Sequence, residues 1–379
     1  MQKNTSAFPI GVILSTCPNL TYLKCSQERA IPTYQVLGSV PTTPLYSLVS
    51  CELSFHQLDD DLVEHLLGCC PSLRSLSIGQ CNLAAASVVR RLCPNLRALG
   101  FNTHLRHPLH RKEDVYGPNA PQGIRHLSIS VEADDDAEEI IQLIADNAEA
   151  IETMSIHFSK PEPLMNAVHQ WDPLTTIPFT RVRTLNISGL DEMYSDIVPG
   201  LLIGCANLEE LVLEICQFID SPVFEQISQM EHLHTLELRL LTEVDLHGIA
   251  NMFQAFSTRP SLRTICIDSC LFTMPLQVFQ AIATIPTLEN IYLGMPLFIG
   301  PIWFERFARL LREHASNLQS IVLRDTEYVT DAALEQIASI ESLRKVQLRG
   351  LKNVTSKGLG YLEANPNIVL QIDRPLISL

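Results

Sequence analysis

Two cysteines, Cys70 and Cys81, stand eleven residues apart in the stretch CPSLRSLSIGQCNL, with aliphatic residues between them. Cysteine thiolates ligate metals and take part in redox chemistry, whereas a protonated thiol packs as a small apolar group. The sequence holds 11 cysteines but no C-x-x-C pair, the spacing through which zinc sites commonly gather their ligands. An odd number also fits reduced thiols better than a disulfide framework. We therefore expect the cysteines to be reduced and to serve a scaffold.

A second candidate site is the run HLRHPLHRKED at 104–114, in which His104, His107 and His110 recur at every third position. Imidazole nitrogens in such a cluster could bind zinc or nickel. The run belongs to a polar segment with Pro and Gly, at about 102–123, that lacks helical periodicity and is typical of a surface loop. We expect no metal there, and metal analysis of the purified protein distinguishes the two interpretations.

Two acidic runs, Asp59–Asp61 and Asp134–Asp136, invite a calcium interpretation. Both directly precede helical patterns (LVEHLL and AEEIIQLIADNA), where carboxylates cap the first turn and oppose the helix dipole. The alternating carboxylates and turn glycine of a calcium loop are missing from the sequence, as are G-x-S-x-G, a phosphate-binding glycine loop and H-E-x-x-H. We therefore expect helix starts, no cofactor and no enzymatic activity.

The net charge of −15, from 42 acidic and 27 basic residues, disfavours nucleic acid and anionic membrane as partners. The short apolar run from Phe8 to Leu14 is interrupted by Pro9, and no window reaches the length of a membrane span. These features favour a soluble protein of the cytoplasm and/or nucleus. Hydrophobic residues make up 46% of the chain, which can fill a long core.

An internal repeat runs through the whole chain and explains the cysteines. Each repeat has an aliphatic anchor with further aliphatic residues three and five positions later, the L-x-x-L-x-L pattern of leucine-rich repeats. Successive anchors lie 23 to 31 residues apart. They are Leu20, Leu48, Leu73, Leu96, Ile124, Ile151, Val182, Leu208, Leu233, Leu262, Leu288, Leu318 and Leu343, with a degenerate one near Ile368.

The cysteines follow this repeat. Cys17, Cys70, Cys93 and Cys205 stand three residues before an anchor, and Cys81, Cys216 and Cys270 stand eight after one. Stacked repeat positions form ladders, in which a thiol packs among its neighbours and its S–H can reach a carbonyl. The spacing therefore predicts structural thiols.

Between anchors the pattern becomes helical. In VTDAALEQIASIESL we expect Thr330 or Asp331 to cap a helix with Leu334 and Ile337 facing inward. In GPIWFERFARLLREHA, Pro301 suits the first helical turn, and Phe304, Phe307 and Leu311 form the buried stripe. The sequence thus predicts an α/β fold, a leucine-rich-repeat solenoid (horseshoe) with a parallel β-sheet on the concave face and helices on the convex face. We expect one solenoid over residues 1–379, with about 13–14 repeats and a polar loop insertion at about 102–123.

The segment YVTDAALEQIASIESLRKVQLRGLKNVTSKGLGYLEANPNI at 328–368 opens its helices with V-T-D/S-x-x-L, at Val329 and Val354. It resembles the cysteine-containing leucine-rich repeats of F-box/LRR proteins, the substrate receptors of cullin-based ubiquitin ligases. The resemblance implies a protein-interaction scaffold that recognises a substrate protein. An alternative is an F-box-independent regulator, similar to the ribonuclease-inhibitor or Ran GTPase-activating types, that binds a protein on its concave face.

In that family an F-box of about three helices precedes the repeats and recruits the ligase subunits. Some sixteen residues precede Cys17, without a leucine–proline opening, so we expect either a relative without an F-box or an F-box on a missing or separate segment. An uncapped first repeat would expose core and strand edge, so we also expect a partner or a further domain to cover it.

Alternation along each strand sends the second, fourth and sixth residues after an anchor to the concave surface. From Ser75 to Ser188 these residues are small and mostly polar. Further on they are charged, with a predicted acidic patch and, beyond Tyr292, a basic one. The acidic patch comprises Glu210, Glu214, Glu237 and Asp268, interrupted by Arg239, and the basic patch comprises Arg324, Lys345 and Arg349. Ordinary solvated surface is the alternative, but separation by sign favours a site for an asymmetric protein partner.

Overall fold

In the computed structural model the chain divides into two compact units, Met1–Val182 and Arg183–Leu379. The structure describes residues 13–14, 16–26, 46–54, 64, 66–79, 89, 91–101, 122–131, 137–158, 168–190, 196–271, 274–294, 300–325 and 327–373. Each unit is a run of leucine-rich repeats, in which a short strand leads into a turn and a returning segment. That the whole chain forms a single solenoid stays a prediction.

The first unit contains a parallel sheet whose strands follow one another in chain order. They are β1 (Tyr22–Ser26), β2 (Ser50–Ser54), β3 (Ser75–Ile78), β4 (Ala98–Phe101), β5 (His126–Val131) and β6 (Thr153–Phe158). Each pairs residue by residue with the next, beginning with Tyr22 opposite Ser50. Helix α5 (Ala137–Asn147) confirms the helix expected after Asp136, and a 3₁₀ helix, η2 (Val168–Thr176), follows β6.

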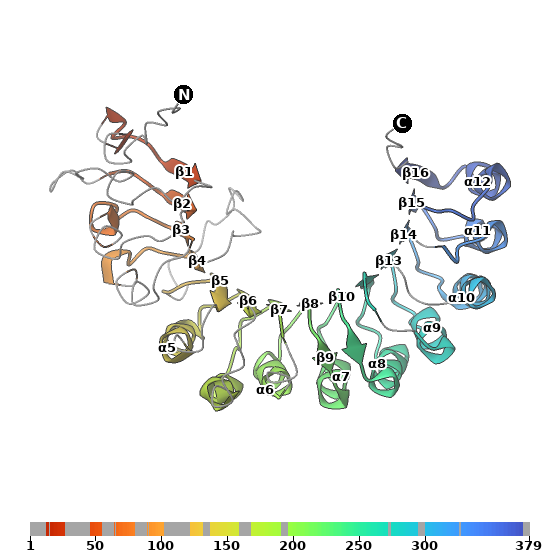
Figure 1. Ribbon diagram of the computed structural model, residues 1–379, viewed down its shortest axis with the longest axis horizontal. Coiled ribbons are helices and arrows are strands. Elements are labelled where there is room, and N and C mark those ends of the chain that lie inside the picture. Colours follow the sequence, from red (N-terminus) through yellow and green to blue (C-terminus); the bar gives the residue numbers. More distant parts are fainter. Residues whose placement is uncertain are drawn as a thin grey trace, which may run out of the picture. The chain divides into compact units, whose positions relative to one another are not determined.

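The second unit alternates strands and helices more regularly, and its main strands again pair in parallel. These strands are β7 (Thr184–Ser188), β8 (Glu210–Glu214), β10 (Thr235–Arg239), β12 (Thr264–Asp268), β13 (Asn290–Gly294), β14 (Ser320–Arg324), β15 (Lys345–Arg349) and β16 (Val369–Asp373). The helices are α6 (Ile197–Gly204), α7 (Ser221–Ser228), α8 (Leu246–Thr258), α9 (Leu276–Ala283), α10 (Pro301–His314), α11 (Asp331–Ala338) and α12 (Ser356–Glu363). Two short strands, β9 (Phe218–Ile219) and β11 (Glu243–Val244), pair with each other. Within this unit the sheet lines the inner side of an arc and the helices lie outside it (Figure 1).

The repeat pattern accounts for the strands. Leu233 and the next two aliphatic residues of its repeat, Leu236 and Leu238, are fully buried, whereas Thr235 and Glu237 between them are partly exposed. Alternate side chains therefore enter the core between sheet and helices, as the spacing predicts. Burying one such leucine contributes roughly 1.5–3 kcal/mol, and the repeats share one continuous core because a single repeat cannot bury its apolar face.

The helices begin and pack as the sequence predicts. Thr330 caps α11, and its hydroxyl accepts a hydrogen bond from the Ala333 N–H at 3.3 Å. Pro301 is the first residue of α10, where its missing N–H costs nothing. The buried face of α10 consists of Phe304, Phe307, Ala308 and Leu311. None of the helices in the described residues combines the length and apolar character needed to cross a bilayer.

Ten of the eleven cysteines lie in the described residues, and all ten are free thiols. Most are buried, and Cys216 and Cys270 point their sulfurs at the carbonyl oxygens of Glu214 and Asp268, both at 3.5 Å, as expected for a ladder. Cys17 differs, because it precedes β1 and is exposed. Cys81, the histidine run at 104–110, the insertion over 102–121 and both acidic runs lie outside the described residues.

Candidate functional site

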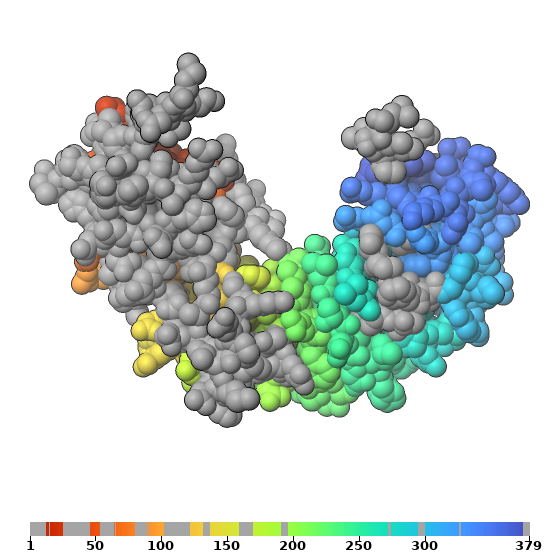
Figure 2. Space-filling model, viewed as in Figure 1, coloured from red at the N-terminus to blue at the C-terminus, as the bar shows by residue number. Residues whose placement is uncertain are grey.

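All nine residues predicted to bind a partner lie on the inner face of the sheet in the second unit. Strand pairing aligns them in three rows across the strands. The first row contains Glu210, Thr235, Thr264, Asn290, Ser320 and Lys345, and the second contains Val212, Glu237, Cys266, Tyr292, Val322 and Gln347. The third contains Glu214, Arg239 and Asp268, then Gly294, Arg324 and Arg349. We call these three rows the sheet face. Figure 2 shows the second unit, coloured from green to blue, curved around this side.

Arg239 interrupts the predicted acidic patch by binding one of its members. Its Nη2 lies 2.7 Å from Oε2 of Glu237, two residues earlier on the same strand. The guanidinium also lies against the Cys266 thiol of the neighbouring strand. Burial, with the nearby Glu237 carboxylate, raises the pKa of Cys266 to about 12. This thiol therefore stays protonated at neutral pH and is not a nucleophile.

A second cluster joins β12, β13 and β14. The Tyr292 hydroxyl lies 3.5 Å from Oδ2 of Asp268 and 3.4 Å from Nη1 of Arg324, and that Nη1 lies 3.8 Å from the same Asp268 oxygen. Nε of Arg324 is 3.1 Å from Oδ2 of Asp325. Burial raises the pKa of Tyr292, against the opposing effect of its hydrogen bond with Arg324, so the phenol stays neutral.

Gly294 makes this cluster possible. It stands between Asp268 and Arg324 on the middle strand, and a Cβ at this position would overlap the Asp268 carboxylate. The missing side chain lets the acid and the base approach each other across a whole strand. The sequence pattern did not single out Gly294 or Asp325. Gly294 could have been noticed in the sequence, because the equivalent position of the neighbouring repeats holds a charged residue.

The pairing corrects the predicted separation of charge. Asp268 was assigned to an acidic patch and Arg324 to a basic one, but the two form a pair, because Gly294 leaves room between them. Glu210 and Glu214 remain at the β8 end of the sheet face, partly exposed, while Lys345 and Arg349 are exposed at the β15 end. The sheet face therefore has an acidic end, a neutralised centre and a basic end.

Part of the corresponding face of the first unit is closed. Ser75, Ser77 and Ser130, predicted to point to the concave surface, retain only 7%, 4% and 3% exposure, and Ala98 retains none. Alternation gives the direction of these side chains correctly but says nothing about what lies over them. The closure is local, because Lys24 on the same face of β1 is exposed.

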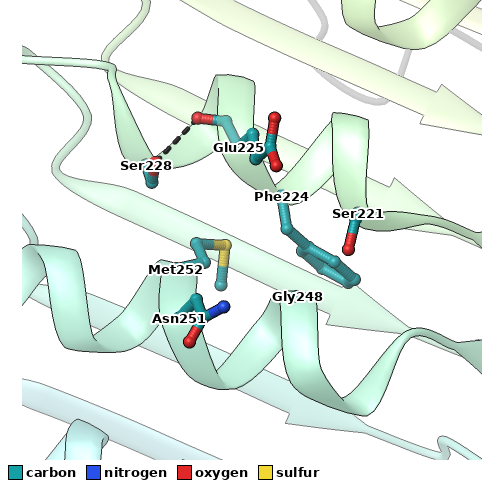
Figure 3. A pocket seen from close by; sticks show the side chains of 7 residues that line it. All are labelled: Ser221, Phe224, Glu225, Ser228, Gly248, Asn251 and Met252. Carbon is teal, nitrogen blue, oxygen red and sulfur yellow. Dashed lines mark hydrogen bonds between the residues drawn. The ribbon is translucent and has the colours of Figure 1, made fainter.

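Other candidate sites offer little chemistry. Figure 3 shows a small pocket between α7 and α8, lined by Ser221, Phe224, Glu225, Ser228, Gly248, Asn251 and Met252. Two of its hydroxyls are engaged, Ser228 with the Glu225 carbonyl at 2.7 Å and Ser221 with the Asp245 carboxylate. Among the described residues, His, Cys, Asp and Glu side chains form no group of three or more suited to a metal ion.

No protein-family model matches the chain, and no curated protein matches it. A chain in the crystal structure of the Rad7 and Elc1 complex in yeast is similar, at 13% identity and a TM-score of 0.50. The match covers 89% of this chain and 82% of that chain. The likeness is one of fold. It supports the leucine-rich-repeat architecture and leaves the activity to be inferred from the sheet face.

Proposed function

We propose that this chain is a protein-binding scaffold whose partner lies on the sheet face of the second unit. The observation that carries the proposal is the sheet face, three register-aligned rows with charged and aromatic side chains, in which the acids lie on β8 and the bases on β15. Opposite charges at the two ends give an asymmetric partner one preferred orientation and steer its approach. The rigid strands hold these groups in place before binding, which lowers the entropic cost of association.

We further infer that the partner is a substrate protein of an F-box/LRR-type ubiquitin ligase. The repeat pattern at 328–368 supports this, since it is similar to that family. The Rad7 and Elc1 structure, in which a similarly folded chain belongs to a protein complex, agrees with a role in assembly. An F-box-independent regulator is the competing outcome. Pull-down of purified cullin and adaptor subunits supports the ligase role, whereas stimulation of a GTPase supports the regulator.

Photo-crosslinking tests the position of the partner. A benzophenone amino acid at Val322, in the middle row between Tyr292 and Gln347, should capture the partner, while the same group at the exposed Glu335 of α11 should not. The captured protein then serves as the ligand for affinity measurements.

Charge reversal tests which residues bind. Glu210→Lys, Glu214→Lys and Glu237→Lys together should weaken binding of that partner about tenfold at low salt, and less at high salt, because exposed charges are screened. Folding should persist, since surface ion pairs contribute only about 0.2–1 kcal/mol each. The matched control reverses Glu225, Glu335 and Glu363, which are exposed on α7, α11 and α12, and should leave affinity unchanged. Equal affinity of both triple variants at low salt would exclude the sheet face as the binding site.

A further inference from the structure

In the second unit the residue seven positions after the anchor follows the strand directly and repeatedly adopts the left-handed backbone conformation. The positions are Gly189 (φ 77°), Ile215 (φ 57°), Leu240 (φ 52°), Ser269 (φ 56°), Asp325 (φ 51°) and Gly350 (φ 63°). At four of these positions, Gly189, Ile215, Leu240 and Asp325, the N–H group extends the sheet pairing by one residue. The Ile215 N–H donates to the Arg239 carbonyl at 3.0 Å, and the Leu240 N–H donates to the Asp268 carbonyl at 2.9 Å. The conformation is therefore a fixed part of the repeat.

The residue types at this position differ sharply in how well they suit it. Glycine adopts positive φ without a steric cost, and aspartate tolerates it through local hydrogen bonds. Isoleucine and leucine bring Cβ close to a backbone carbonyl oxygen, and a β-branched residue there is a true outlier. Ile215 and Leu240 are thus strained relative to Gly189 and Gly350, which serve the same turn.

Burial does not offset this strain. The Ile215 side chain is 43% exposed and that of Leu240 is 45% exposed. They are neighbours, because Ile215 pairs with Arg239, the residue before Leu240. Leu271 is 59% exposed and lies beside this pair, because its N–H donates to the carbonyl of Leu241, the residue after Leu240, at 2.8 Å. We call Ile215, Leu240 and Leu271 the aliphatic ridge, and it runs along the carboxyl edge of strands β8, β10 and β12.

Acidic groups flank the ridge. Glu214 precedes Ile215, and Glu243 is exposed three residues after Leu240. Arg239 lies 2.7 Å from Glu237 and also interacts with Glu214, so around this cation the carboxylates of Glu214, Glu237 and Glu243 leave an excess of negative charge. A second copy of this acidic edge would repel the first, so self-association does not explain the ridge. Apolar side chains with an acidic rim complement an apolar group that has basic neighbours.

We propose that the aliphatic ridge docks an extended segment of a protein partner that carries large apolar side chains flanked by Lys or Arg. The proposal rests on the proposed function, since it names the chemistry of the partner beside the acidic end of the sheet face. On this proposal, aliphatic residues occupy the strained positions 215 and 240 because their side chains contact the partner.

The test measures both stability and peptide binding, because substitutions at the strained positions should maintain or raise stability while they weaken binding. Ile215→Asn and Leu240→Asn place a residue that tolerates positive φ at each strained position. The double variant should melt at the same or a higher temperature than the parent, yet bind about tenfold more weakly. The probe is a fluorescein-labelled synthetic peptide of about twelve residues, with leucines between arginines in a Gly/Ser background, titrated by fluorescence anisotropy. Comparison peptides replace the arginines by glutamates or the leucines by serines, and both should bind more weakly to the parent.

Matched variants keep the outcome decisive. Ile203→Asn removes an aliphatic side chain that is 65% exposed on α6, away from the ridge, and should leave peptide binding unchanged. Leu271→Ser removes a ridge side chain at a residue that does not have the left-handed conformation. This single variant, in which Ile215 and Leu240 are unchanged, should also weaken peptide binding. Parental affinity in the double variant, or equal binding of the glutamate peptide, overturns the proposal. Failure of the proposed function looks different, since the crosslinker at Val322 would then capture nothing while the peptide still bound the ridge.

Discussion

The cysteines show how one residue type follows from its repeat position. Burial raises the pKa of Cys205, Cys216 and Cys266 to about 12 and that of Cys93 and Cys270 to about 11. The thiolate, which is the reactive form, is therefore rare at neutral pH. Cys17, by contrast, is exposed to solvent.

We expect native thiols to react very unevenly with a thiol reagent such as 5,5′-dithiobis(2-nitrobenzoate) at pH 8. At a pKa of about 12, roughly one thiol in ten thousand is ionised, against about a quarter for an unperturbed cysteine. Cys17 should react rapidly, and the buried cysteines should react only as the protein unfolds. Mass spectrometry of the labelled peptides gives the order, and Cys17→Ser should remove the fastest reaction among the ten described cysteines. Rapid labelling of Cys205 or Cys266 in the folded protein would contradict the ladder interpretation.

At the scale of the elements, side chains at helix starts join neighbouring repeats. The Asp331 carboxylate, in the first turn of α11, accepts hydrogen bonds from the Thr355 N–H at 2.8 Å and the Thr355 hydroxyl at 2.5 Å at the start of α12. The Thr330 hydroxyl in turn bonds Oε1 of Glu305 on α10 at 2.7 Å. An anion at a helix N-terminus also interacts favourably with the helix dipole. These bonds fix the stacking of successive helices.

Asp331→Asn should make stability depend less on pH. The hydrogen bonds from Thr355 lower the pKa of Asp331 in the folded state, so ionised Asp331 stabilises the fold above the unfolded pKa of about 3.9. That contribution is lost as the pH falls through the folded pKa. The variant should therefore melt at a lower temperature than the parent at pH 7, and the gap should close in acid. Glu335→Gln, exposed on the same helix, is the control, and a gap that persists undiminished at low pH would contradict the assignment.

At the scale of the whole molecule, each repeat gains its stability from its neighbours. The stability of such arrays is a sum of repeat and interface contributions, so a strand with one partner is held less firmly than a strand with two. Among the described strands β16 pairs with β15 alone, and its Val369 and Ile372 are 61% and 40% exposed. Strands β12 and β13 each have a partner on both sides.

Hydrogen exchange should follow this order. We expect the amides of β16 to exchange at least about tenfold faster than those of β12 and β13, because opening β16 disrupts fewer buried contacts. Mass spectrometry of peptides covering 264–268, 290–294 and 369–373 measures the difference. Equal protection of β16 and β13 would mean that something beyond nearest-neighbour stacking holds the last strand.

The sequence by itself determined the repeat, the direction of each strand residue and the helix starts. Anchors such as Leu233, caps such as Thr330 and the stripe on α10 were all predictable, because burial alternates with fixed periods along strands and helices. The repeat position of the cysteines predicted their burial, with Cys17 as an exception.

Contacts between strands were decided only by the tertiary structure. The pairing of Asp268 with Arg324 depends on the empty position at Gly294, a strand away from each, and corrects the predicted patches. The burial of Ser75 and Ser77, and the left-handed backbone at the exposed Ile215 and Leu240, were likewise visible only in the tertiary structure. Periodicity specifies which way a side chain points, whereas its partners and its exposure are set by residues about 25 or more positions away.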